Sequence, residues 1–244
     1  MLTALANPHR FMAFSRWAAP LCGALAVLLI APGLWLGLAA PPDYQQGTTV
    51  RIMFVHVPAA WTSMFAYACL GGSSLISLVF RHAIADAAAR AAAPLGAGFT
   101  LLALITGSLW GRPMWGAWWV WDARLTSVFV LFLLFVGYVA LRSAIDDERK
   151  AVTPAAILAL SGLIVLAIVK LSVECTPILC VNTLHQGESI FRADGPTIAP
   201  VFLIPLALMG AGYTFAFGAL WLERTRGEVW RRRAEALEVQ AAGR

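Results

Sequence analysis

The segment Gly111–Thr126, GRPMWGAWWVWDARLT, lies between two long apolar runs of the chain. Its four tryptophans are Trp115, Trp118, Trp119 and Trp121. With Trp110, five of the chain's ten tryptophans fall within twelve residues. Indole rings favour the membrane–water interface, so a belt that anchors nearby helix ends is one interpretation. A belt spreads its rings around the perimeter, whereas five rings in one connection build a broad aromatic surface that suits a large planar ligand.

The composition identifies the class of protein. The 244 residues are 60% hydrophobic and 13% charged, with a mean hydropathy of +0.75, which leaves too few polar residues to cover a water-soluble domain. We therefore expect an integral membrane protein in contact with lipid. The net charge of +5 could suggest nucleic acid, but the basic residues are sorted by membrane side, so no nucleic-acid partner is expected.

Six apolar runs predict an all-α fold with six transmembrane helices, because each run is close to the roughly 20 residues needed to cross the hydrocarbon core. The runs cover about 17–39, 58–80, 92–109, 124–142, 154–172 and 197–221, within one membrane domain, 1–244. The first run is too long for a signal peptide, and it lacks the cleavage site of small residues that a signal peptide has. Residues 222–244 hold six arginines and predict a basic amphipathic tail on the cytoplasmic membrane surface.

Lysine and arginine are distributed unequally between the two sides of these spans. Thirteen of the eighteen fall on the side of the two termini, and five fall on the side of the tryptophan segment. The positive-inside rule then predicts that both termini are cytoplasmic and that the tryptophan segment, between the third and fourth spans, faces outward.

The same assignment separates the four histidines. His9 and His82 fall on the cytoplasmic side among basic residues, where solvated polar roles are expected. His56, in the connection 40–57, and His185 fall on the outer side, at the mouths of the second and sixth spans. Two neutral imidazoles beside an aromatic surface are what a six-coordinate haem iron needs, one from each face. Topology alone makes this a weak signal, and the tryptophans strengthen it.

Further polar residues on the outer side would suit a porphyrin. Its two propionates call for cations. The candidates are Arg51, Arg112, Arg124, Lys170 and Arg192. Arg124 could equally be an interfacial residue whose charge reaches the headgroups. Asp122 precedes the fourth span by two residues, so we expect its carboxylate to cap that helix and to fix where the rings point.

Three motifs resemble one known family. The stretch Trp115–Thr126 resembles the tryptophan-rich WWD signature of membrane haem-handling proteins, and Arg51–Trp61 and Val181–Gly187 are similar to the flanking motifs of the haem exporter protein C (CcmC) family of bacterial cytochrome c maturation. The resemblance covers nearly the whole chain. It implies that haem b binds as transported cargo at the outer face, with His56 and His185 as axial iron ligands. The implied haem-binding residues of the segment are Trp115, Trp118, Trp119, Trp121, Asp122 and Arg124.

The resemblance also implies a setting and a set of partners. The chain would lie in the bacterial inner membrane with its haem site facing the periplasm, and would present haem to a periplasmic haem chaperone (CcmE). ABC-type ATPase subunits (CcmA and CcmB) and a small single-span subunit (CcmD) would complete the complex. No catalytic residue is implied, so we do not expect an enzyme.

One stretch of the sequence departs from the family pattern. Residues 172–185 run about five residues longer than the family's and lack a tryptophan pair, and Cys175 and Cys180 there could form a disulfide or remain free thiols. Cys22 and Cys69 are expected to pack within spans.

The main alternative function is electron transfer through a bis-histidine haem, although an electron carrier would normally hold its ligands on facing spans. An ion channel is weaker still, because the spans carry almost no charge.

Overall fold

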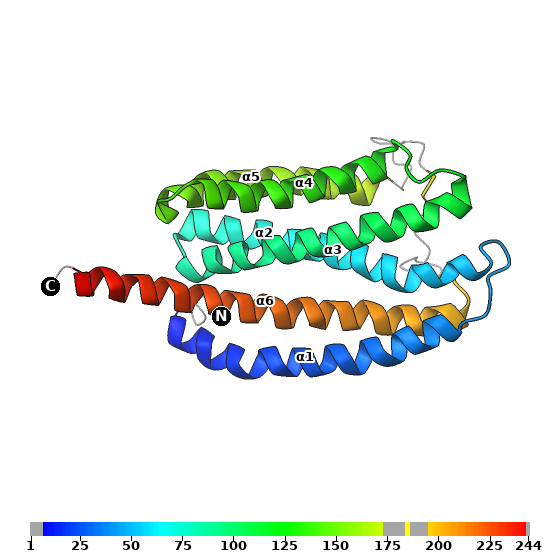
Figure 1. The fold of residues 1–244 in the computed structure, drawn as a ribbon, viewed down its shortest axis with the longest axis horizontal. Coiled ribbons are helices and arrows are strands. Elements are labelled where there is room, and N and C mark those ends of the chain that lie inside the picture. The colour runs from blue at the N-terminus through cyan, green and yellow to red at the C-terminus, as the bar shows by residue number, and fades with distance from the viewer. Residues whose placement is uncertain (1–6, 173–183, 186–194, 243–244) are drawn as a thin grey trace.

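The computed structural model describes residues 7–172, 184–185 and 195–242, and the fold of these residues is all-helical (Figure 1). Six helices are long and apolar enough to cross a membrane, which confirms the predicted fold class. The elements are α1 (Pro8–Ala39), the 3-10 helix η1 (Thr48–Ile52), α2 (Met53–Phe80), α3 (Ala83–Trp115), α4 (Ala123–Ala144), α5 (Glu148–Leu171) and α6 (Pro200–Ala242). Residues 116–122 of the tryptophan segment connect α3 to α4, while its first five residues belong to the last turns of α3 and its last four to the start of α4.

The helices form a layered bundle with two distinct ends (Figure 1). The α4–α5 hairpin packs on α2 and α3, these two pack on α6, and α1 packs mainly along α6. One end carries residues 40–52 and 116–122, and we call it the tryptophan end. The opposite end carries the start of α1, the two short links after α2 and α4, and the end of α6, and we call it the terminal end.

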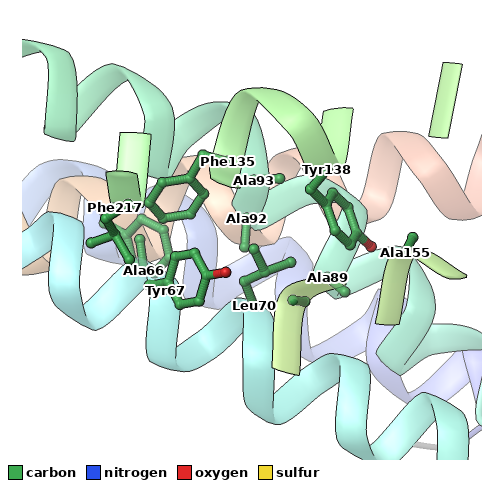
Figure 2. Packing of buried hydrophobic residues seen from close by; sticks show 12 residues of the cluster. Ala66, Tyr67, Leu70, Ala89, Ala92, Ala93, Phe135, Tyr138, Ala155 and Phe217 are labelled. Carbon is green, nitrogen blue, oxygen red and sulfur yellow. The ribbon is translucent and has the colours of Figure 1, made fainter. Parts of the chain in front are cut away.

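The core between these helices is built from a few large rings and many small residues (Figure 2). Tyr67 of α2 and Phe135 of α4 meet edge to face, with ring centroids 4.8 Å apart. Glycines allow this approach, since a Cβ on Gly96 would lie 2.1 Å from the Phe135 ring and one on Gly162 would lie 1.8 Å from the Tyr67 hydroxyl. Small residues serve helix packing in membranes in this way. The result is a close-packed middle that fixes the positions of α2, α3 and α4.

Several helices begin earlier than their apolar runs. The Asn7 side chain accepts a hydrogen bond from His9 N–H at 2.9 Å and caps α1. His82 caps α3, where its Nδ1 accepts from Ala85 N–H at 3.1 Å, so this histidine has a structural role and is not simply solvated. Hydropathy marks the stretch suited to hydrocarbon, whereas caps and the alanine-rich sequence after His82 decide where helical hydrogen bonding starts.

The start of α2 places His56 differently from the sequence prediction. We expected His56 in a polar connection, with the second span beginning at Pro58. Instead η1 leads directly into α2 at Met53, so that His56 and Pro58 both lie within the helix. The His56 ring is therefore carried by a rigid element.

Residues 222–242 continue α6 without a break, and do not form a separate tail helix beside the last span (Figure 1). This continuation is held by ion pairs across the terminal end. The Asp86 carboxylate accepts from Arg142 Nη1 at 2.8 Å and Nη2 at 3.2 Å, and from Arg232 Nη2 at 2.5 Å. Arg231 Nη2 contacts Glu148 at 2.5 Å. These ion pairs join four helices, α3, α4, α5 and α6, at the terminal end.

Candidate functional site

A cavity opens at the tryptophan end between α2, α3 and α4. Its empty volume is about 960 Å³, part of which is open to solvent. Side chains predicted for the site from widely separated parts of the sequence line it. They are His56, Trp115, Trp119, Arg124 and His185.

The hydrogen bonds of His56 determine which ring nitrogen carries its proton. Nδ1 lies 3.0 Å from the Ala103 carbonyl oxygen and 3.1 Å from Thr106 Oγ1. A carbonyl oxygen only accepts, so the neutral imidazole must carry its hydrogen on Nδ1 and donate it to α3. Nε2 then keeps its lone pair. A ring whose second nitrogen is held by a carbonyl is the usual arrangement of a metal-ligating histidine.

Close packing fixes the plane of the same ring. Trp110 meets His56 edge to face, with centroids 5.6 Å apart, and its Nε1 donates to Gln46 Oε1 at 3.0 Å. On the side of α3, a Cβ added to Gly107 would lie 2.9 Å from His56 Cε1. The imidazole is thus oriented by hydrogen bonds and by contacts with two neighbouring residues.

Asp122 joins the start of α4 to the segment that carries His185. Its Oδ1 accepts from Leu125 N–H at 2.7 Å, which confirms the predicted helix cap. Its Oδ2 accepts from Leu184 N–H at 3.3 Å, one residue before His185. The carboxylate is nearly buried and does not line the cavity. Its place in the site is that of a residue that positions others.

The four tryptophans of the segment divide into two pairs. Trp115 and Trp119 line the cavity, whereas Trp118 and Trp121 lie outside it and are 58% and 74% exposed. Trp119 contacts Trp121 and Phe129 edge to face, with centroids 5.6 and 6.1 Å apart. The single aromatic surface suggested by the sequence is therefore two surfaces, one inside the cavity and one facing outward.

The candidate cations for acidic groups of a ligand also divide. Arg124 lines the cavity. Arg51 instead donates to the Ala40 carbonyl at 3.1 Å, and Arg112 donates to the Gly116 carbonyl at 2.6 Å. Lys170 is exposed on α5. Arg192 lies outside the described residues, as do Cys175 and Cys180.

Sequence reasoning missed the wall supplied by α3. Thr106, Gly107 and Ser108 stand together near the outer end of an apolar run, and the structure places the first two against His56 and the third in the cavity wall. Small and hydroxyl residues within a span often mark close contact, and this was the available signal. Gln46 and Met64, which also line the cavity, gave no such signal.

The fold and the cavity define a multi-pass membrane protein with a cavity at one end of its bundle that is lined by two imidazoles and by aromatic side chains. The chain matches the family described as Heme exporter protein C over residues 1–240, and it belongs to that family.

Three relatives of the same name illustrate the match. The Bradyrhizobium diazoefficiens protein is 51% identical over 240 residues, which cover 98% of this chain and 89% of the relative. The Paracoccus denitrificans protein is 44% identical over 232 residues, 95% of each chain. The Escherichia coli K12 protein is 44% identical over 223 residues, 91% of this chain and 88% of its own.

Proposed function

We propose that this chain holds haem b in the cavity at the tryptophan end, with His56 and His185 as axial ligands, and passes it to a periplasmic haem chaperone. Membership of the family makes haem handling, and not turnover chemistry, the function. One observation carries the proposal for the site. The His56 ring donates from Nδ1 to the Ala103 carbonyl, which leaves Nε2 as a ligand in a cavity that His185 also lines.

The other cavity residues fit the chemistry of a porphyrin. Trp115 and Trp119 offer apolar and stacking contacts, each worth roughly 1 to 3 kcal/mol when fully buried. The Arg124 guanidinium suits a propionate. The exposed rings of Trp118 and Trp121 would contact an outward edge of the haem or the partner that receives it.

The orientation in the membrane belongs to the same proposal. The terminal end carries the excess of lysine and arginine, so it faces the cytoplasm of an inner-membrane protein and the tryptophan end faces the periplasm. The haem chaperone (CcmE) would then approach the tryptophan end. The ATPase subunits (CcmA and CcmB) and the single-span subunit (CcmD) would assemble elsewhere on the chain.

The visible spectrum of the purified protein tests the axial ligands. Wild type should show six-coordinate low-spin haem, and both His56→Ala and His185→Ala should lose it. Added imidazole should partly restore it in His56→Gly, because a free imidazole can occupy the vacated position. His9→Ala, at the terminal end, is the matched control. An unaltered spectrum in both ligand variants would refute the assignment.

Electron transfer through a bis-histidine haem is the second candidate. It gains support from the structure, because His56 lies on a helix and faces α3, as a ligand of an electron carrier would. The two functions differ in whether the haem leaves the protein. A haem handler loses its haem to the purified apo-chaperone, whereas an electron carrier keeps it through repeated cycles of reduction and oxidation.

A further inference from the structure

A second hollow lies directly beside the cavity, between α3 and α4. Its lining residues are Leu104, Ile105, Ser108, Trp119, Trp121 and Phe129, and we call it the lateral groove. Three of these residues, Leu104, Ser108 and Trp119, also line the cavity. The cavity and the lateral groove are therefore neighbours that share one wall.

The lateral groove opens on the side of the bundle that faces lipid. Ile105 is 51% exposed, and Leu101 and Leu109, one turn before and after it on α3, are exposed as well. These residues belong to an apolar helix that crosses the membrane, so their surroundings are acyl chains. The lining is mostly apolar, with Ser108 as its hydroxyl residue. An amphiphilic, largely apolar molecule dissolved in the bilayer would meet this opening directly.

Trp119 is the large side chain in the shared wall. Its ring contacts Trp121 and Phe129 edge to face, and its Nε1 is buried with no hydrogen-bond partner among the described residues. Buried indole N–H groups usually have a partner, and turning such a ring normally breaks that bond. A turn of the Trp119 ring would therefore break no hydrogen bond in the described part of the chain. The N–H is also left available to a passing acceptor, such as a carboxylate.

We propose that haem enters the cavity sideways from the bilayer, through the lateral groove, with the Trp119 side chain moving aside to admit it. The proposal rests on the proposed haem site and adds the route to it. Haem partitions into membranes through its apolar macrocycle. Entry at the level of α3 and α4 lets the ring pass between hydrophobic walls and reach His56 without crossing water.

The rate at which the protein takes up haem from lipid tests this route. Apo-protein in nanodiscs is mixed with vesicles that carry haem in their bilayer, and the growth of the low-spin spectrum is followed. Ile105→Trp fills the lateral groove at a residue that does not line the cavity. It should slow loading about tenfold, which corresponds to about 1.4 kcal/mol on the barrier to entry. The final spectrum and the haem bound at equilibrium should stay unchanged, because a route alters rates in both directions equally.

Leu101→Trp is the matched control, since it adds the same side chain to an exposed residue of α3 outside both hollows. Phe129→Ala gives a second test, because it removes a ring that holds Trp119 and should speed loading. Equal slowing by both tryptophan substitutions, unchanged loading in Ile105→Trp and Phe129→Ala, or an altered final spectrum in Ile105→Trp would each overturn the route. A wild-type protein with no low-spin haem would instead overturn the proposed function.

Discussion

A single methyl group added to α3 should displace the proposed haem ligand His56 without changing the imidazole itself. In Gly107→Ala the new Cβ would lie 2.9 Å from His56 Cε1, whereas non-bonded carbons settle at about 3.5 Å or more. The ring must therefore retreat by about 0.6 Å, the difference between these values. A movement of the ring directly away from Ala103 lengthens the distance from Nδ1 to the Ala103 carbonyl oxygen from 3.0 Å to about 3.6 Å. At that distance the two atoms no longer form a hydrogen bond.

The loss of that hydrogen bond sets the expected effect on haem binding. A net contribution of about 0.5–1.5 kcal/mol corresponds to a weakening of up to about tenfold. The low-spin electron paramagnetic resonance signal should shift too, because its g-values depend on the plane of the axial imidazole. Haem titration of purified apo-protein gives the affinity. Gly98→Ala is the control, since Gly98 lies on the same helix and its added Cβ would meet nothing within 4 Å. Equal affinity and identical signals in the two variants would refute the reasoning.

Three further experiments test other parts of the structure. Asp122→Ala should broaden or weaken the low-spin spectrum, and the loss of the helix cap should lower the free energy of unfolding by about 0.5–2 kcal/mol. Asp122→Asn should keep the cap and most of the spectrum. Arg142→Met should lower the free energy of unfolding by about 1.5–3 kcal/mol, because it removes one of the two arginines that bind the Asp86 carboxylate and leaves Arg232 alone, and adding Asp86→Asn should recover part of the loss. In a cysteine-free background, Ala117→Cys should react with an impermeant thiol reagent in intact cells and Ala144→Cys only after lysis; the reverse pattern would invert the proposed orientation.

The fold class and the placement of the candidate site residues at one end of the bundle could be predicted from the sequence, because both depend only on the order of residues along the chain. The apolar runs are long enough to identify spans, and the alternation of connections places His56, His185 and the tryptophans at one end. The cap at Asp122 was also predictable, since a carboxylate before an apolar run is the usual start of a helix. These features need no knowledge of which helices touch.

The remaining features depend on contacts between distant segments. The division of the tryptophans follows from the turn at Gly116, whose φ of 74° ends α3 and sends residues 117–122 off at a new angle. The continuation of α6 depends on Asp86 and Glu148, which lie far from Arg231 and Arg232 in the sequence. Counting arginines along the chain shows a basic tail but cannot show that its charges are paired.

The two proposed ligands differ in how they are supported, and this difference favours transport over electron transfer. His56 lies on α2, bonded to α3 and packed against Trp110 and Gly107. His185 lies in the long connection between α5 and α6, and its neighbour Leu184 is bound to Asp122. An electron carrier gains from two equally rigid ligands, because small rearrangements keep electron transfer fast. A haem donor instead gains from one ligand held within a helix and one that lies outside the helices, where an incoming partner can reach it. Haem transfer to the apo-chaperone should therefore be faster in His185→Ala reconstituted with imidazole than in His56→Gly treated the same way, and equal rates would remove this distinction.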